Sequence, residues 1–551
     1  MEERRLLLAV ALSLLVLTAY QLLVPPRPTP RASPSPSPAA PRPAASAPLE
    51  PRQPEPPAPS ALVSDDQERR VEVQGPDITA AFTNRGARLV SWRLTRFTDA
   101  RGRPEEMVES VVGGPRPLDL ETGDKGVDER LREALFRSST DTLVVTGGGE
   151  QTLAFEFAET SFLARKVFRF EPRGYLVSIS AEVIRDGQPL PLRILWGPGV
   201  GNPTPAEKEV QGYQPPQAVA LLASGVERFP AAKIGASRIL GDVRWVGVES
   251  HYFAALFVPP PTGSQAEIRG VSLPGPGAAP QTTPQAAVTL PSADAVALLY
   301  VGPKDYQVLG GLGHSLASVV PVGDWIGPIV VVLMRLLSWV HEHVGNYGWS
   351  IVALTVLINL AMAPLRHYSI ANGMKMAKLA PEMKVIQERY RKVPALDPKR
   401  QEMQKEVAAL YERHGMSMGT QMTVGCLPIL LTMPFLIAFY RVLDVSIQLR
   451  GSPFLWIPDL SHRDPLFLTP LLMGVSMFTM QRLTPSTMDP AQQRIMTIMP
   501  IVFTVMFFAA PAGLNLYWLA SNVCSILQQG VTLRLIRGKD ADEGKKERRR
   551  R

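Results

Sequence analysis

The chain has 551 residues, a mean hydropathy near zero and a formal net charge of +8. That length has room for three or four domains, and the average hydropathy hides a polar, Pro-rich first half and a very apolar second half. Two cysteines, Cys426 and Cys524, both lie in apolar runs, which argues against a disulfide framework and against a thiolate metal site. The positive charge favours a membrane surface or an RNA-rich partner over small acidic substrates.

The first 64 residues predict an anchor followed by a tether. Within residues 1–24, Arg4 and Arg5 precede an apolar run that is close to the length of a spanning helix. No small-x-small site closes the run, so we expect an uncleaved transmembrane anchor with a cytoplasmic N-terminus; a cleaved signal peptide is the alternative. Residues 25–64 are rich in Pro, Ala, Ser and Arg and predict a periplasmic linker that cannot bury enough apolar surface to order itself.

Residues 65–310 show short alternating strands broken by Gly and Pro, which predict a periplasmic β-sandwich domain. The triple glycine at 147–149 is not a phosphate loop, because no GK[ST] follows and no helical pattern opens there. His251 with Glu249 is better explained by a packed or solvated strand end than by a metal site. Sugar binding by the sandwich stays open.

Residues 324–344 carry apolar side chains at helical spacing with a polar opposite face. Asp324 is the expected N-cap, and Trp325 and Trp339 suit the headgroup level of a membrane. These features predict an amphipathic helix that lies in the outer interface. A buried helix of a globular domain is the alternative.

Residues 348–366 contain the apolar run SIVALTVLINLAMAPLR and are expected to form transmembrane helix 2. At 1.5 Å per residue, Asn359 lies about 15 Å beyond Trp349, near the membrane midplane. Thr355 is one turn above Asn359, and Arg366 is two turns below it at nearly the same azimuth. Polar groups at this depth face protein or a wet cavity, so the helix is interpreted as one wall of a hydrophilic groove.

The remainder of the chain predicts a hairpin, four further spans and a basic tail. Residues 367–421 are basic, with helical periods on both sides of the sequence PALDP, which indicates a cytoplasmic helical hairpin. Residues 424–530 would supply transmembrane helices 3–6, packed as one bundle because their connections are short. The spans are expected at 424–443, 466–483, 495–510 and 514–527 or beyond. The tail, residues 531–551, ends in KKERRRR, which suits anionic lipid or rRNA and keeps both termini in the cytoplasm.

The last span carries a polar stripe at spacings of three and four, made by Asn515, Trp518, Asn522, Ser525 and Gln529. Two helices with a wet face predict a cavity between them. The alternative for each amide is a hydrogen bond that only joins neighbouring helices. Sixteen of the 19 methionines follow residue 360, and their flexible side chains suit surfaces that accept many apolar sequences.

No catalytic constellation accompanies this expected cavity. The sequence has no HExxH, nucleophile elbow or Walker loop, and the spans show no mid-depth pair of carboxylates. A small-solute transporter would show repeat symmetry, and a lipid- or sugar-processing enzyme would need convergent titratable groups; neither pattern is visible. The chain is therefore not expected to be an enzyme or to hold a metal or a cofactor.

Long motifs within residues 346–529 resemble the YidC membrane protein insertases of bacterial inner membranes, in the Oxa superfamily. Three of these motifs read GNYGWSI, GCLPILLTMPFLIAFYRVL and RIMTIMPIVFTVMFFAAPAGLNLYWLASNVCSILQQ. The resemblance implies an α+β membrane protein with six transmembrane helices, one N-terminal anchor plus a five-helix insertase core, and a periplasmic β-sandwich domain. It also implies a groove open to the cytoplasm and to lipid. Expected partners are nascent membrane proteins, the Sec translocon, the phospholipid bilayer and, through the hairpin and tail, the ribosome, but not DNA.

One position departs from the family pattern. The family usually has an Arg four residues after a Thr in the first core helix, whereas here Asn359 follows Thr355 at that spacing. Our hypothesis is that Asn359 keeps the groove hydrated while Arg366 supplies the positive potential. The resemblance also makes Tyr517 and Trp518 groove-lining candidates. The full set of expected substrate-binding groove residues is Thr355, Asn359, Arg366, Asn515, Tyr517, Trp518 and Asn522.

Overall fold

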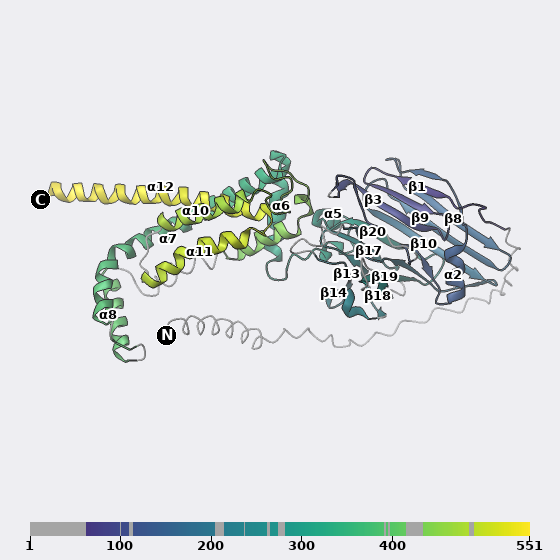
Figure 1. Cartoon of the computed structure of the whole chain (residues 1–551), viewed down its shortest axis with the longest axis horizontal. Coiled ribbons are helices and arrows are strands. Elements are labelled where there is room, and N and C mark those ends of the chain that lie inside the picture. Colours follow the sequence, from purple (N-terminus) through teal and green to yellow (C-terminus); the bar gives the residue numbers. More distant parts are fainter. Residues whose placement is uncertain are drawn as a thin grey trace, which may run out of the picture. The chain divides into compact units, whose positions relative to one another are not determined.

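The computed structural model describes residues 62–550 apart from short internal gaps. The ranges outside the description are 1–61, 100, 110–113, 204–213, 236, 262–264, 274–280, 391–392, 395–396, 415–432, 484–489 and 551. The expected anchor, most of the expected tether and the first half of the third expected span therefore lie outside the described residues. Strands occupy the first part of the described chain and helices the second (Figure 1).

The strands form three sheets, in which β1 and β7 are parallel neighbours and the other pairs are antiparallel. The first sheet has the order β4-β3-β2-β1-β7, made of β1 Arg70–Gln74, β2 Ile78–Thr83, β3 Arg88–Thr98, β4 Pro104–Glu106 and β7 Thr142–Val144. The third has the order β15-β18-β19-β12-β5, made of β5 Leu120–Glu121, β12 Leu192–Trp196, β15 Arg238–Leu240, β18 Ala266–Leu273 and β19 Gln281–Leu290.

The second sheet is the largest, with ten strands in the order β14-β13-β16-β17-β20-β10-β9-β8-β6 and β11 paired to β10. Its strands are β6 Arg137–Ser138, β8 Gln151–Glu159, β9 Phe162–Phe170, β10 Leu176–Arg185, β11 Gln188–Pro189, β13 Gln217–Leu222, β14 Gly225–Pro230, β16 Trp245–Glu249, β17 Phe253–Val258 and β20 Ala297–Pro303. Both five-stranded sheets contact it. The ring of Phe82 on β2 lies 5.1 Å from that of Phe168 on β9, and β12 and β19 contact β10 and β16.

Strand β9 shows why this sequence folds as a layered sheet. Its buried side chains alternate with less buried ones along the whole strand, which is the period of a pleated sheet with one face in a core. One inward position is Lys166, whose side chain is about 1% exposed. Its Nζ donates hydrogen bonds to the carbonyl oxygens of Gly86, Ala87 and Leu118 at 2.7, 3.0 and 2.9 Å. A buried ammonium needs such partners, and these three complete its donor capacity.

The strand domain also contains short helices that the sequence pattern did not predict. They are α2 Lys125–Glu133, α4 Ala231–Ile234, α5 Tyr306–Gly311 and the 3-10 helix η1 Leu316–Val319. Helix α2 begins after Asp124, whose carboxylate accepts the amides of Gly126 and Val127. An Asp cap before so short a helix is a weak signal among strands, which explains why it was missed.

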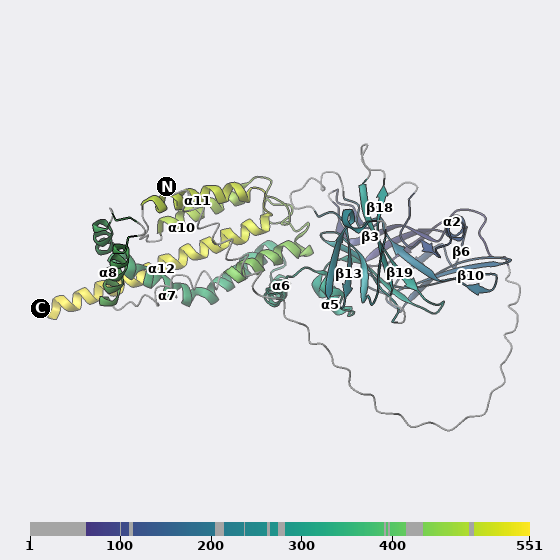
Figure 2. The ribbon, with the colours of Figure 1, turned by 90° about the horizontal axis from the view of Figure 1, so that it is seen from below.

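The helical part contains α6, which was predicted to lie in the membrane interface, and further helices of which α7 and α12 are the longest. Their bounds are α6 Gly327–Val344, α7 Tyr347–Arg389, α8 Lys399–Arg413, a helix at 433–445, the 3-10 helix η2 Ile447–Leu449, α10 Leu468–Leu483, α11 Pro490–Phe507 and α12 Ala512–Arg550. Helix α12 packs against α7 and α10, and α10 packs against α11 (Figure 2). Gly474 on α10 permits the last contact, because a Cβ there would collide with Thr504 on α11.

Some boundaries differ from those predicted. Helix α6 begins at Gly327 with Ile326 at the cap position, so Asp324 is not the N-cap. Helix α7 runs without a break through the expected boundary at residue 366 to Arg389, and it forms the first arm of the hairpin with α8 as the second. Helix α12 continues through the expected basic tail to Arg550. Charged residues with good helix propensity extend both helices beyond their apolar segments.

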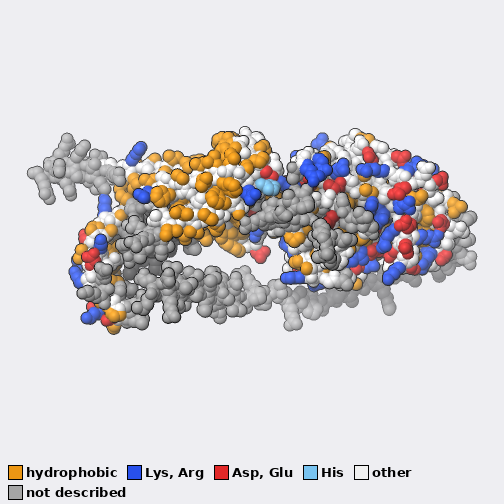
Figure 3. All heavy atoms as spheres, viewed as in Figure 1, with side chains coloured by type: hydrophobic (Ala, Val, Ile, Leu, Met, Phe, Trp, Pro, Cys, Tyr) orange, Lys and Arg blue, Asp and Glu red, His pale blue; other side chains and the backbone are white. Residues whose placement is uncertain are grey.

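The two parts present different surfaces. Hydrophobic side chains cover much of the visible face of α7, α10, α11 and α12, whereas charged side chains of both signs cover the strand domain (Figure 3). By length and composition, α7 is the one helix among the described residues that is long and apolar enough to cross a membrane. The apolar segment of α11, Met496–Phe507, is shorter.

Candidate functional site

Helix α7 places the three polar residues of the expected groove wall on one face. Its first turn is fixed by Asn346, whose side chain accepts the amide of Trp349 at 3.2 Å. Thr355 is fully buried and donates its hydroxyl to the carbonyl of Ile351 at 2.6 Å. Asn359 is 7% exposed, and its amide donates to the carbonyl of Thr355 at 2.8 Å. The carbonyl oxygen of the Asn359 side chain is thereby left to accept from another group.

That other group is Arg366. Its Nη1 donates to Asn359 Oδ1 at 2.7 Å and to Ser525 Oγ on α12 at 2.5 Å. Side chains on a helix lean toward its N-terminus, so the guanidinium lies above its own Cα, toward Asn359. The two residues, which were predicted to share one face of the helix, are therefore joined by a direct hydrogen bond. The positive charge of Arg366 is therefore directed away from the basic hairpin, whose first arm is the later part of α7.

A cavity of about 560 Å³ lies between α7 and α12 beside this contact. It is lined by Val356, Asn359, Leu360, Ala363, Pro364, His367, Cys524, Leu527, Gln528, Val531, Thr532 and Leu535. Most of these side chains are apolar, and Leu360, Leu527 and Val531 are exposed. Asn359 thus contributes a polar group to a largely apolar wall.

Three polar residues of this cavity were not among the expected groove residues. His367 Nδ1 and Thr532 Oγ1 are 3.2 Å apart, and the Gln528 amide donates to the carbonyl of Ala363 at 2.7 Å. His367 lies on α7, whereas Gln528 and Thr532 repeat at a spacing of four with Cys524 on α12, next to the stripe predicted from the sequence. That spacing was the signal in the sequence that could have identified the polar residues on α12. It was missed because a stripe does not show how far the polar face extends around the helix.

The expected stripe of α12 is divided among several neighbours. Asn522 donates to Ser476 Oγ on α10 at 2.9 Å, and Gln529 donates to the carbonyl of Leu483 at 2.8 Å. These two contacts fit the alternative in which an amide hydrogen bond only joins neighbouring helices. Ser525 lies on the other side of the stripe and contacts Arg366.

The other expected residues of α12 lie nearer its start. The Asn515 amide donates to the carbonyl of Phe507 at 3.2 Å, while its Oδ1 is buried and accepts no hydrogen bond from the described residues. Tyr517 stacks on Phe439 with ring centroids 4.1 Å apart, and Trp518 packs edge-on against Phe507 at 5.2 Å. The structure joins Asn359 and Arg366 by a hydrogen bond, whereas the contacts given above for Asn515, Tyr517, Trp518 and Asn522 are made with other residues.

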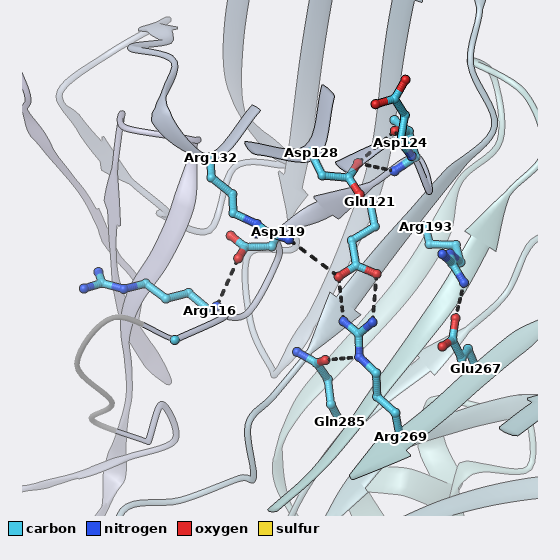
Figure 4. A network of polar contacts seen from close by, with 12 residues as sticks. Arg116, Asp119, Glu121, Asp124, Asp128, Arg132, Arg193, Glu267, Arg269 and Gln285 are labelled. Carbon is cyan, nitrogen blue, oxygen red and sulfur yellow. Dashed lines mark hydrogen bonds and ion pairs between the residues drawn. The ribbon is translucent and has the colours of Figure 1, made fainter. Parts of the chain in front are cut away.

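A second polar cluster crosses the third sheet of the strand domain (Figure 4). Arg269 on β18 forms two hydrogen bonds to Glu121 on β5, at 2.6 and 3.1 Å, and one to Gln285 on β19 at 2.5 Å. Arg193 pairs with Glu267 in the same layer. Each of these charges has a partner of opposite sign, and both ion pairs join strands that are not adjacent in the sheet, so the cluster ties the layer together across its strands.

Among the described residues no group of three His, Cys, Asp or Glu side chains is arranged to hold a metal ion. The imidazole of His251 instead contacts the backbone carbonyl of Asp444 at 3.1 Å. Burial lowers the pKa of His251, which favours its neutral form.

Comparisons with known proteins cover almost the whole chain. The family model described as YidC periplasmic domain matches residues 70–340, and the one described as 60Kd inner membrane protein matches residues 339–539. A membrane protein insertase YidC from Geobacter metallireducens is 31% identical over 558 residues, which cover 98% of this chain and 100% of that protein. One from Citrifermentans bemidjiense is 32% identical over 556 residues, covering 96% and 98%.

Two solved structures of YidC proteins are distant matches to this chain. The crystal structure of YidC from Thermotoga maritima is 13% identical, with a TM-score of 0.31 over 86% of this chain and 100% of that chain. An active YidC insertase with its first transmembrane domain resolved has a TM-score of 0.35 and 16% identity, over 86% and 94%. At these scores the superposition itself supports no further argument, and the sequence comparisons carry the relationship.

Proposed function

The chain belongs to the YidC family of membrane protein insertases, and from this premise we propose how it works. Hydrophilic ends of nascent membrane proteins enter a groove between α7 and α12, and their apolar segments then pass into the bilayer. The observation that carries this proposal is the Arg366 guanidinium held by Asn359 and Ser525 beside a cavity of about 560 Å³. The family is not a family of enzymes, and the proposed step breaks no covalent bond.

The physical basis is the cost of polar groups in hydrocarbon. An unpaired amide or hydroxyl loses several kcal/mol when it leaves water for an apolar medium, and a charge loses more. A cavity that carries polar groups in its wall and reaches partway into the membrane shortens the apolar part of the route. The exposed apolar side chains along its edge, such as Leu360 and Leu527, offer the transmembrane segment a surface between groove and lipid. Burial of nonpolar surface in lipid then favours release.

We assign the positive potential of the groove to Arg366. Asn359 occupies the position at which the family usually has Arg, and it is neutral. The Arg366 side chain reaches toward that position, so its charge lies closer to Asn359 than its place in the sequence suggests. Thr355 supports Asn359 from the turn above through its backbone carbonyl. In this arrangement Asn359 orients the guanidinium and Arg366 supplies the charge.

The partners and topology follow from the same proposal. The hairpin of α7 and α8 has its own small core of Leu379, Met383, Leu410 and Tyr411 and presents Lys and Arg side chains to solvent. A folded basic hairpin next to a groove suits contact with a ribosome and with a nascent chain. We place this hairpin and both termini in the cytoplasm, six spans in the inner membrane and the strand domain in the periplasm, with the Sec translocon as a second partner.

Insertion by the purified protein in liposomes tests the role of Arg366. A short single-span substrate with an acidic leading segment is added, and protection of that segment from external protease is measured. We expect Arg366→Ala to reduce insertion roughly tenfold, because it removes charge-assisted hydrogen bonds inside the groove. Arg482→Ala is the matched control, since Arg482 lies at the end of α10 and contacts Phe478. Equal insertion by Arg366→Ala and the parent protein would remove Arg366 from the mechanism.

Thiol labelling tests the hydration of the groove separately. Cys524 lines the cavity, so a Cys426→Ser variant leaves it as the single thiol. A membrane-impermeant maleimide supplied from the cytoplasmic side should label Cys524, because thiolates form readily only where water reaches. Prior binding of a stalled substrate should slow the labelling. Labelling by lipid-soluble reagents alone would mean that the cavity is dry.

A further inference from the structure

A second cavity, of about 250 Å³, lies where turns of the strand domain meet the end of the 433–445 helix and the loop that follows it. Its lining combines both signs of charge with aromatic rings. The charged, histidine and tyrosine side chains of this lining include Glu105, His251, Tyr252, Tyr440, Asp444 and Arg450. It is separate from the groove, since the two cavities share no lining residue among those described.

The walls of this cavity are held by specific contacts. Arg450 pairs with Glu105 at 2.9 Å, and their side chains are only 14% and 8% exposed. The guanidinium of Arg450 also lies 5.2 Å from the ring centroid of Phe253, a cation–π distance. On the other side His251 Nε2 contacts the carbonyl of Asp444 at 3.1 Å. The cavity is therefore built by ordered side chains and is not an accidental gap.

The chemistry of the lining matches a small zwitterion. The carboxylates of Asp444 and Glu105, with the rings of Tyr252 and Tyr440, favour an ammonium group. Arg450 favours a phosphate. Burial raises the pKa of Tyr252 to about 12, so its hydroxyl keeps its proton and can donate. The volume is below that of pockets for drug-sized ligands, which restricts the occupant to a small polar group.

An apolar stripe leads away from the cavity along the 433–445 helix. Tyr440 lines the cavity, and Ile437 and Met433 follow it at spacings of three and four, on one face of the helix. The three side chains are 47%, 37% and 47% exposed. On a helix of a membrane protein, such a stripe is a surface for acyl chains. A polar cavity continuous with an apolar stripe has the form of one phospholipid.

We propose that this cavity binds the headgroup of a zwitterionic aminophospholipid, with its ammonium near Asp444, its phosphate near Arg450 and its acyl chains along Tyr440, Ile437 and Met433. Arg441 pairs with Asp444 at 3.0 Å, so a lone cation would meet a carboxylate that is already neutralised. A headgroup with both charges can instead face both members of that pair. The bound lipid would join the strand domain to the membrane at this point.

Lipid retention by the purified full-length protein tests the proposal. Delipidated protein in detergent is titrated with phosphatidylethanolamine, phosphatidylcholine, phosphatidylglycerol or soluble phosphoethanolamine, and native mass spectrometry counts the bound molecules. We expect one retained phosphatidylethanolamine. Phosphatidylcholine should bind more weakly because its quaternary ammonium donates no hydrogen bond. Phosphoethanolamine should also bind more weakly because it lacks acyl chains.

Two variants and a control complete the test. Asp444→Asn should lower phosphatidylethanolamine retention roughly tenfold, by removing a charge-assisted hydrogen bond. Tyr440→Ala should lower it as well, while Asp294→Asn, on the exposed surface of the strand domain, should have no effect. Equal or tighter binding of phosphatidylglycerol would overturn the zwitterion assignment. Unchanged retention in both variants, or equal binding of phosphoethanolamine, would overturn the site.

Discussion

The strand domain buries one basic side chain and the helical part half-buries another, and the two are held differently. Lys166 lies inside the strand domain with its three protons on three backbone carbonyls. Arg366 lies between α7 and α12 and contacts two side-chain oxygens, beside a cavity. Backbone carbonyls of buried turns between packed strands have little freedom to move, whereas a serine and an asparagine can change rotamer. The first arrangement stabilises a fold, and the second leaves a charge that a ligand can share.

The surfaces of the strand domain and of the helical part also differ, in where their polar groups lie. Ion pairs such as Arg269 with Glu121 tie the strands of the third sheet together, and charges of both signs face solvent. The helices expose apolar side chains and keep their polar groups inside, as Asn522 and Ser476 do. The strand domain and the helical part therefore use polar groups in opposite places. The comparison predicts that removing Lys166 affects folding, while removing Arg366 affects transport.

The largest expected effect is on the stability of the strand domain. Lys166→Ala should lower its free energy of unfolding by about 3–5 kcal/mol, because three carbonyls lose their donor and a cavity is left. Urea unfolding of the full-length protein, followed by fluorescence of the buried Trp92, Trp196 and Trp245, measures this. Lys125→Ala, in the first turn of α2, is an exposed control that should cost little. A loss below about 1 kcal/mol would show that the three contacts do not stabilise the fold.

A relocation of charge within α7 is the next test. If Asn359 only orients the Arg366 guanidinium, and insertion depends on where that guanidinium lies, an Arg placed at position 359 should replace Arg366. Asn359→Arg combined with Arg366→Ala should recover most of the roughly tenfold loss expected for Arg366→Ala alone. Insertion into liposomes measures both. Failure of the double variant, with normal folding by circular dichroism, would show that the site requires Arg366 and Asn359 as a pair.

A smaller effect comes from pH. Burial lowers the pKa of Lys166 to about 7 from its ordinary value of 10.5. Between those values the unfolded chain binds a proton that the folded chain does not, so this residue makes stability rise with pH, by about 1.4 kcal/mol per unit at most. Below about pH 7 both states are protonated and the contribution is constant. Comparison of the parent with Lys166→Met from pH 6 to 9 isolates it, and a parallel pH dependence in both proteins would contradict it.

Much of this organisation could be predicted from the sequence, and the part that could not has a physical reason. Period-two alternation predicted a strand domain. The family resemblance, which the comparisons confirm, predicted the helical insertase region of the chain. The spacing of Asn359 and Arg366 predicted one face, because helix geometry is fixed locally.

Tertiary packing decides what the sequence leaves open. The stripe of α12 gave no means to know that Asn522 faces α10 while Ser525 faces α7. Both lie within one turn of the same helix, and only the positions of the neighbouring helices separate their roles. The continuation of α7 to Arg389 was also missed, since the boundary was placed where the apolar run ends at Arg366 and the basic section begins, and the helix continues through that change.

That separation gives the smallest and sharpest test of the comparison. Ser525→Ala removes one of the two oxygens that hold the Arg366 guanidinium, and we expect insertion to fall about threefold to fivefold, the worth of one hydrogen bond. Ser476→Ala is the matched control, because it removes a hydroxyl from the contact with Asn522 on the opposite side of α12. It should lower the stability of the bundle slightly and leave insertion unchanged. Equal losses of insertion in the two variants would mean that both serines only join helices, and Arg366 would then need no particular orientation.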